Sequence, residues 1–142
     1  MKSEKGFSLA EVMLAIALLG IVSVAFLGAM STASTAIFIA DERATAESLA
    51  RSQMEYVKNQ AYSVAPSGGQ VTYQKISGIP EGYTICSLNR SGDTVENTIY
   101  GVPWNSQAGL PASTDTGLQR VKLVIKHIDK QVLILEGFKV QR

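Results

Sequence analysis

Residues 6–40, GFSLAEVMLAIALLGIVSVAFLGAMSTASTAIFIA, decide the fold of this chain. From Val12 to Ala40 the stretch contains no charged residue, and about 20 consecutive apolar residues are enough for a helix that crosses a bilayer. The pattern therefore predicts a membrane helix. Glu11 is the exception in this stretch, because a carboxylate costs about 2.5–3.5 kcal/mol at the centre of a membrane helix and less near its end. Such a residue calls for a functional reason.

The charges that flank this stretch predict its orientation. Lys2 and Lys5 precede the apolar run and residues 41–43 (Asp, Glu, Arg) follow it, so the positive-inside rule places the N-terminus in the cytoplasm and the rest of the chain outside. A helix over residues 7–40 is about 51 Å long, whereas the hydrocarbon core is about 30 Å thick. Part of the apolar surface is therefore expected to contact other proteins. Small residues at spacings of three and four predict a helix-packing face at Ala25, Ala29, Ala33, Ala36 and Ala40.

Residues 41–64 are predicted to continue the helix as a water-soluble, amphipathic second half that ends near residue 62. The predicted apolar stripe consists of Ala46, Ala50, Met54, Val57 and Ala61. A neighbouring face carries Glu47, Arg51, Glu55 and Lys58, which we interpret as a solvated face with modest ion-pair support. The helix-breaking residues 65–69 (APSGG) follow.

Residues 65–142 are predicted to form strands and loops. Short β-branched or aromatic segments predict strands at 71–76, 83–88 and 95–100. Residues 101–117 are expected to be a loop in which Trp104 packs inward. Strands at 118–128 and 131–140 are predicted to form an antiparallel hairpin that turns at Asp129-Lys130. Its apolar faces are predicted to be Val121, Leu123 and Ile125 on the first strand, and Val132, Ile134 and Phe138 on the second.

These segments together predict an α+β fold, in which a long N-terminal helix packs on a small antiparallel β-sheet. The expected division is a short leader at 1–6, a membrane helix at 7–40 and one soluble domain at 41–142. The amphipathic half of the helix is assigned to the soluble domain because it is the only long element that can cover the apolar face of the hairpin.

Composition and spacing argue against several functions. The net charge of +1 gives no basic cluster for nucleic acid. The lone Cys86 excludes an internal disulfide and a multi-cysteine metal site. Cys86 and His127 have no local signature of a catalytic pair, and the acids around His127 lack metal-ligand spacing. We therefore expect no enzyme activity, no cofactor and no metal.

Residues 5–12 (KGFSLAEV), followed by an apolar helix, resemble the class III signal of type IV prepilins and type II secretion pseudopilins. The resemblance implies that prepilin peptidase cuts between Gly6 and Phe7 and methylates the new amino group of Phe7. It assigns Glu11 to filament assembly, where its carboxylate neutralises the amine of its own chain or, preferably, that of a neighbouring subunit. The implied partners are other pilin or pseudopilin subunits, prepilin peptidase, the inner-membrane assembly platform and membrane lipid.

The resemblance also narrows the role in the filament. Residues 46–55 (AESLARSQME) look like the corresponding part of minor pilins and minor pseudopilins. Major pilins often have a proline kink and a C-terminal disulfide loop, and major pseudopilins an acidic calcium loop, none of which is visible here. A minor, initiating or tip subunit is therefore expected, in the inner membrane first and in an extracytoplasmic filament afterwards. Pilus, competence and secretion systems are not distinguished.

Two other interpretations of the N-terminus stay open at this point. One is a bitopic, membrane-anchored binding domain that faces the extracytoplasmic side and never polymerises, which explains the length and orientation of the helix but not Glu11. The other is a secretory signal cut after residues 23–25 (SVA), although the apolar run continues for fifteen residues beyond that point.

Overall fold

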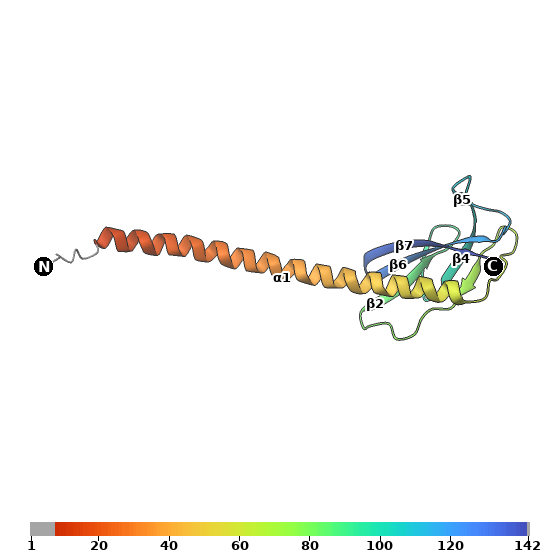
Figure 1. The fold of residues 1–142 in the computed structure, drawn as a ribbon, viewed down its shortest axis with the longest axis horizontal. Helices are drawn as coiled ribbons and strands as arrows, with labels where there is room; N and C mark the ends of the chain where they lie inside the picture. Colours follow the sequence, from red (N-terminus) through yellow and green to blue (C-terminus); the bar gives the residue numbers. More distant parts are fainter. Residues whose placement is uncertain (1–7, 142) are drawn as a thin grey trace. The chain divides into compact units, whose positions relative to one another are not determined.

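The computed structural model describes residues 8–141. Within them the chain forms one helix, α1 (Leu9–Asn59), and seven strands (Figure 1). The chain divides into two compact units, with the boundary between Ala40 and Asp41. The first unit contains the part of α1 that precedes Asp41, and the second contains the rest of α1 and the whole sheet.

The seven strands of the described residues form one antiparallel sheet. They are β1 (Val71–Tyr73), β2 (Tyr83–Leu88), β3 (Thr94–Glu96), β4 (Ile99–Asn105), β5 (Leu110–Pro111), β6 (Leu118–His127) and β7 (Lys130–Val140). Strand β6 is central: β7 pairs along one edge, and β2 and β4 share the other. Ser87 closes the fork between β2 and β4, because its hydroxyl donates to the Lys122 carbonyl at 3.2 Å and accepts from the Tyr100 amide at 3.1 Å.

The second half of α1 packs on one face of this sheet and forms the core with it (Figure 1). The buried helix residues are Ala46, Leu49, Ala50, Gln53, Met54 and Val57. The strands contribute Tyr73, Ile85, Ile99, Val121, Leu123 and Ile125. Gly137 allows close approach, because a Cβ built there would lie 2.7 Å from the Met54 sulfur. The predicted α+β class and the helix-on-sheet packing are confirmed.

The helix ends three residues earlier than predicted, so Ala61 lies outside it and is exposed. The side chain of Gln60 turns to the sheet instead and makes two hydrogen bonds, at 2.8 and 3.1 Å, with the backbone of Gln74. Gln53 does the same from inside the helix, bonding the Gln74 carbonyl at 3.0 Å and the Ile76 amide at 2.9 Å. The side-chain amides of Gln53 and Gln60 thus take the place of strand hydrogen bonds for residues 74–76, which explains why β1 is shorter than predicted.

The predicted strand at 95–100 and the predicted loop at 101–117 are wrong in part. Asn97 has a φ of 61°, which breaks the segment into β3 and β4. Strand β4 then continues to Asn105, through residues that looked like breakers in the sequence. Gly101 is required in the strand, because a Cβ there would lie 2.6 Å from both Gln119 and the Tyr73 ring.

The hairpin of β6 and β7 is confirmed, but one of its faces was misassigned. Val121, Leu123 and Ile125 are buried as predicted. Ile134 and Phe138, in contrast, are 45% and 41% exposed and lie on the face turned away from α1. The register shifts at Ile125/Lys126, so β7 carries an extra residue there and its alternation changes. The turn is also one residue earlier than predicted, at residues 128–129, both with positive φ.

Candidate functional site

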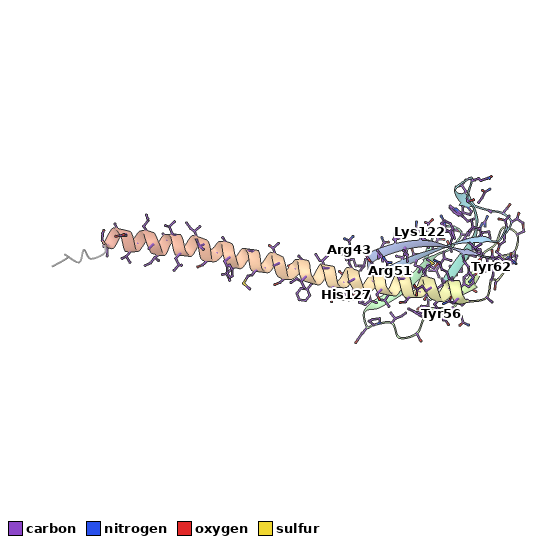
Figure 2. The ribbon with its side chains drawn as sticks, in the orientation of Figure 1. Arg43, Arg51, Tyr56, Tyr62, Lys122 and His127 are labelled. Atoms are coloured by element: carbon purple, nitrogen blue, oxygen red, sulfur yellow. The ribbon has the colours of Figure 1, made fainter. Side chains whose placement is uncertain are left out.

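The part of α1 before Asp41 presents an apolar surface with no cover of its own. All side chains from Leu9 to Ala40 are exposed, and they project from the helix in Figure 2. The most apolar 18-residue window has a mean hydropathy of 2.6, and the helix is long and apolar enough to cross a membrane. This agrees with single-pass anchoring, since a helix that is apolar on every side needs an apolar environment.

Four of the five hydroxyl groups in residues 9–40 are satisfied within the helix. Each donates to the carbonyl four residues earlier, at 2.8 to 3.1 Å: Ser23, Thr32, Ser34 and Thr35. Because these groups keep their hydrogen bonds without water, they can enter lipid or a protein interface at little cost.

Glu11 lies in the first turn of α1 and is exposed. Ser8 precedes the helix, and its hydroxyl accepts from the Ala10 amide at 3.3 Å, while its carbonyl accepts from the Glu11 amide at 3.0 Å. Ser8 and Glu11 thus have the spacing of a capping box, in which Glu or Gln is suited to the third helical position. The sequence prediction did not note this spacing. Gly6 and Phe7, the predicted processing site, lie outside the described residues.

His127 and Cys86 are not brought together as a catalytic pair. The His127 ring stacks on Tyr83 with centroids 4.5 Å apart, and its Nδ1 lies 2.8 Å from Glu42 Oε1. Cys86 is fully buried and pairs with Val124 in the sheet, and burial raises the pKa of its thiol. His127 therefore ties the end of β6 to the helix at Glu42.

Asp115 is the centre of a polar network that fixes the segment after α1. It accepts from the Tyr62 hydroxyl at 2.5 Å, the Ala65 amide at 2.9 Å and the Gln119 side chain at 2.5 Å. Burial alone would raise the pKa of Asp115, but these donors and the Gly117 amide together lower it. Burial and the bond to Asp115 raise the pKa of Tyr62.

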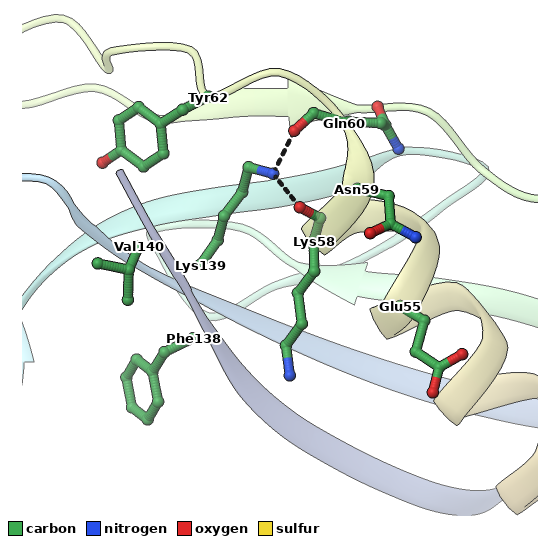
Figure 3. Close-up of a pocket in the computed structure, with 8 residues that line it drawn as sticks. All are labelled: Glu55, Lys58, Asn59, Gln60, Tyr62, Phe138, Lys139 and Val140. Carbon is green, nitrogen blue, oxygen red and sulfur yellow. Dashed lines mark hydrogen bonds between the residues drawn. The ribbon is translucent and has the colours of Figure 1, made fainter. Parts of the chain in front are cut away.

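Lys139 caps the C-terminal end of α1. Its side chain is 4% exposed, and Nζ donates to the carbonyls of Val57 at 2.6 Å, Lys58 at 3.2 Å and Gln60 at 2.6 Å. Figure 3 shows two of these bonds. Burial lowers the pKa of Lys139. The amine borders a hollow of about 550 Å³ lined by Glu55, Lys58, Asn59, Gln60, Tyr62, Phe138, Lys139 and Val140.

No group of three or more His, Cys, Asp or Glu side chains is arranged to hold a metal ion in residues 8–141. In the same residues every buried side-chain nitrogen and oxygen has a hydrogen-bond partner. The polar groups inside the second unit therefore stabilise its structure.

Comparison with known proteins gives one match. Residues 1–27 match the family model of the prokaryotic N-terminal methylation motif. No curated protein and no solved structure matches the chain significantly. The predicted class III prepilin signal is thus confirmed, and it is consistent with a type IV pilin-like protein. The motif supports a pilin- or pseudopilin-like precursor that prepilin peptidase processes, and it is typical of structural proteins rather than enzymes.

Proposed function

We propose that this chain, which carries a class III prepilin signal, is a minor subunit of a type IV pilus-like or type II secretion pseudopilus filament. The observation that carries the proposal is the position of Glu11: it lies within the matched residues 1–27, in the first turn of a helix whose side chains are all exposed up to Ala40. A carboxylate at the start of an apolar helix needs a cation nearby when that helix leaves water.

The cation in this proposal is the amino group of Phe7, which exists only after cleavage behind Gly6. A charge pair between Glu11 of one subunit and Phe7 of the next fixes their axial register as the subunits leave the lipid. The proposal gives processing to Gly6 and Phe7 and assembly to Glu11, and it names prepilin peptidase, other filament subunits and the inner-membrane assembly platform as partners.

The length of the apolar surface supports a filament over an anchor alone. Leu9 to Ala40 extend over about 48 Å, whereas the hydrocarbon core is about 30 Å thick. None of these side chains is buried, so about a third of the apolar length needs cover other than lipid. Neighbouring helices of the same kind supply that cover in a filament. The N-terminus is then cytoplasmic and residues 41–142 lie outside the membrane.

The test separates the charge of Glu11 from its place in the first turn of α1. Gln suits the third helical position as well as Glu does, so Glu11→Gln keeps the helix start and removes only the charge. We expect the Glu11→Gln protein to be cleaved and methylated at Phe7, as measured by intact mass, but its amount in sheared filaments to fall at least about tenfold. Glu47→Gln is the matched control, because Glu47 is an exposed helix carboxylate in the second unit, and it should assemble normally.

Other results would point elsewhere. Normal assembly of the Glu11→Gln protein would contradict the charge pair. If the chain begins at Met1 whether or not the peptidase is present, the remaining interpretation is a bitopic binding domain. If it begins at Phe26, the protein is an ordinary secreted domain.

A further inference from the structure

The sheet face turned away from α1, here called the open face, carries three cations on β6, of which only one lacks a carboxylate partner. Lys122 Nζ lies 4.0 Å from Glu136, and Lys126 Nζ lies 3.0 Å from Glu96. In the described part of the chain no carboxylate lies within 4.0 Å of the Arg120 guanidinium. Two of the three positive charges are thus neutralised, and Arg120 is left with its charge available.

Arg120 is held in place by aromatic side chains. Its guanidinium carbon lies 3.9 Å from the centroid of the Trp104 ring, and the Trp104 and Phe138 rings are 6.4 Å apart. A guanidinium stacked in this way has less side-chain freedom to lose when it binds, and stacking uses the face of the guanidinium and not its N–H donors. Trp104, predicted to pack inward, is half-buried against Arg120 and Phe138 on the open face and is not part of the core beneath α1.

Exposed apolar side chains adjoin this group. Phe138 is 41% exposed and Val140, two residues further along β7, is 58% exposed. Trp and Arg surrounded by apolar groups are the residues that contribute most to protein–protein interfaces. An unpaired cation flanked by apolar surface has a definite complement, which is a carboxylate beside an apolar side chain.

We propose that Trp104, Arg120, Phe138 and Val140 form a docking surface for a segment of another protein that presents one carboxylate beside an apolar side chain. Arg120 binds the carboxylate with two parallel N–H donors, and Phe138 and Val140 cover the apolar side chain. A polyanion such as a nucleic acid or polyphosphate is a poorer complement, because Glu136 and Glu96 cancel the neighbouring charges on the same face. The proposal goes beyond filament assembly and does not depend on it.

The site contains its own reporter, because Trp104 is the only tryptophan of the chain. We suggest titrating the full chain in detergent micelles with the blocked peptide acetyl-Leu-Glu-Leu-amide and with its Gln counterpart, following tryptophan fluorescence. The Glu peptide should bind about tenfold more tightly than the Gln peptide, as expected for one charge-assisted bidentate pair. The ratio of the two affinities is the readout, so a loss of folded protein does not imitate the result.

Three variants test the assignment to Arg120. Arg120→Gln should abolish the preference for Glu, and Arg120→Lys should reduce it, because lysine keeps the charge but not the planar fork. Lys122→Gln together with Glu136→Gln is the matched control on the same face and should keep the preference, since it removes two charges that neutralise each other. Equal affinity for the two peptides in the unmodified chain would overturn the proposal. So would polyphosphate binding that is tighter than that of the Glu peptide and unchanged in Arg120→Gln.

Discussion

The two parts of α1 share one backbone conformation but differ in what surrounds their side chains. From Leu9 to Ala40 every side chain is exposed, whereas between Asp41 and Asn59 six side chains are buried against the sheet. The first part therefore depends on an apolar environment that other molecules supply. The second part has an apolar environment within the same chain, because the sheet covers it. A substitution in the second part should therefore change the free energy of unfolding of the second unit, whereas a substitution in the first part should leave that free energy unchanged.

The largest contrast is expected between two leucines. Leu123 is fully buried in the core, and Leu18 is 56% exposed on the apolar part of α1. Leu123→Ala should lower the free energy of unfolding of the second unit by about 2–5 kcal/mol, because it removes buried apolar volume and leaves a cavity. Leu18→Ala should leave it unchanged. Urea unfolding of the full chain in micelles, followed by Trp104 fluorescence, measures both, and a similar loss in the two variants would contradict the division.

The next effect tests how the second part of α1 ends. Lys139→Met keeps much of the apolar stem but removes the donor to two carbonyls of the last helical turn and to that of Gln60, just after it. Leaving these groups unpaired should lower the free energy of unfolding by about 2–3 kcal/mol. Lys58→Met is the control, because Lys58 is exposed in the last turn and should change stability by at most about 1 kcal/mol. Equal effects of the two substitutions would show that the cap contributes nothing specific.

The smallest effect concerns pH. Because hydrogen bonds lower the pKa of Asp115 in the folded state, its contribution to stability is present above the unfolded pKa of about 3.9 and is lost as pH falls through the folded pKa. Asp115→Asn should lower the free energy of unfolding by about 1–2 kcal/mol at neutral pH and flatten its decline below about pH 4. Unfolding curves at several pH values measure this. An unchanged acid profile would mean that other carboxylates determine it.

Much of this architecture was predictable, because it depends on apolar periodicity. The apolar run, the stripe at Ala46, Ala50, Met54 and Val57, and the alternation in β6 all follow from side-chain burial alone. The prepilin signal was equally visible, since it is a contiguous motif that ends with a carboxylate in an apolar segment.

The features that the sequence did not predict involve polar side chains that are buried because they bond to groups remote in the chain. Gln53 occupies an inward position on the helix and Lys139 an inward position on β7, but their acceptors come from residues remote in the chain. The signal available in the sequence was the same for both: a polar residue stands at a position where the periodicity of the helix or strand calls for an apolar one. The fit of Gly101 against Tyr73 and the bulge in β7 have no local signature, and they decide where β4 continues and which face Phe138 occupies.

The cap at the end of α1 also sets an order in time. Lys139 is separated from its three acceptors by 79 to 82 positions, so the ribosome completes the helix long before it makes the residue that caps it. Contacts across such distances also slow folding, because the entropy of closing a long loop must be overcome first. The apolar part of α1 can therefore enter the membrane while the second unit is still open, and that unit closes only when β7 arrives. The helix is therefore complete well before the unit that it packs against can close.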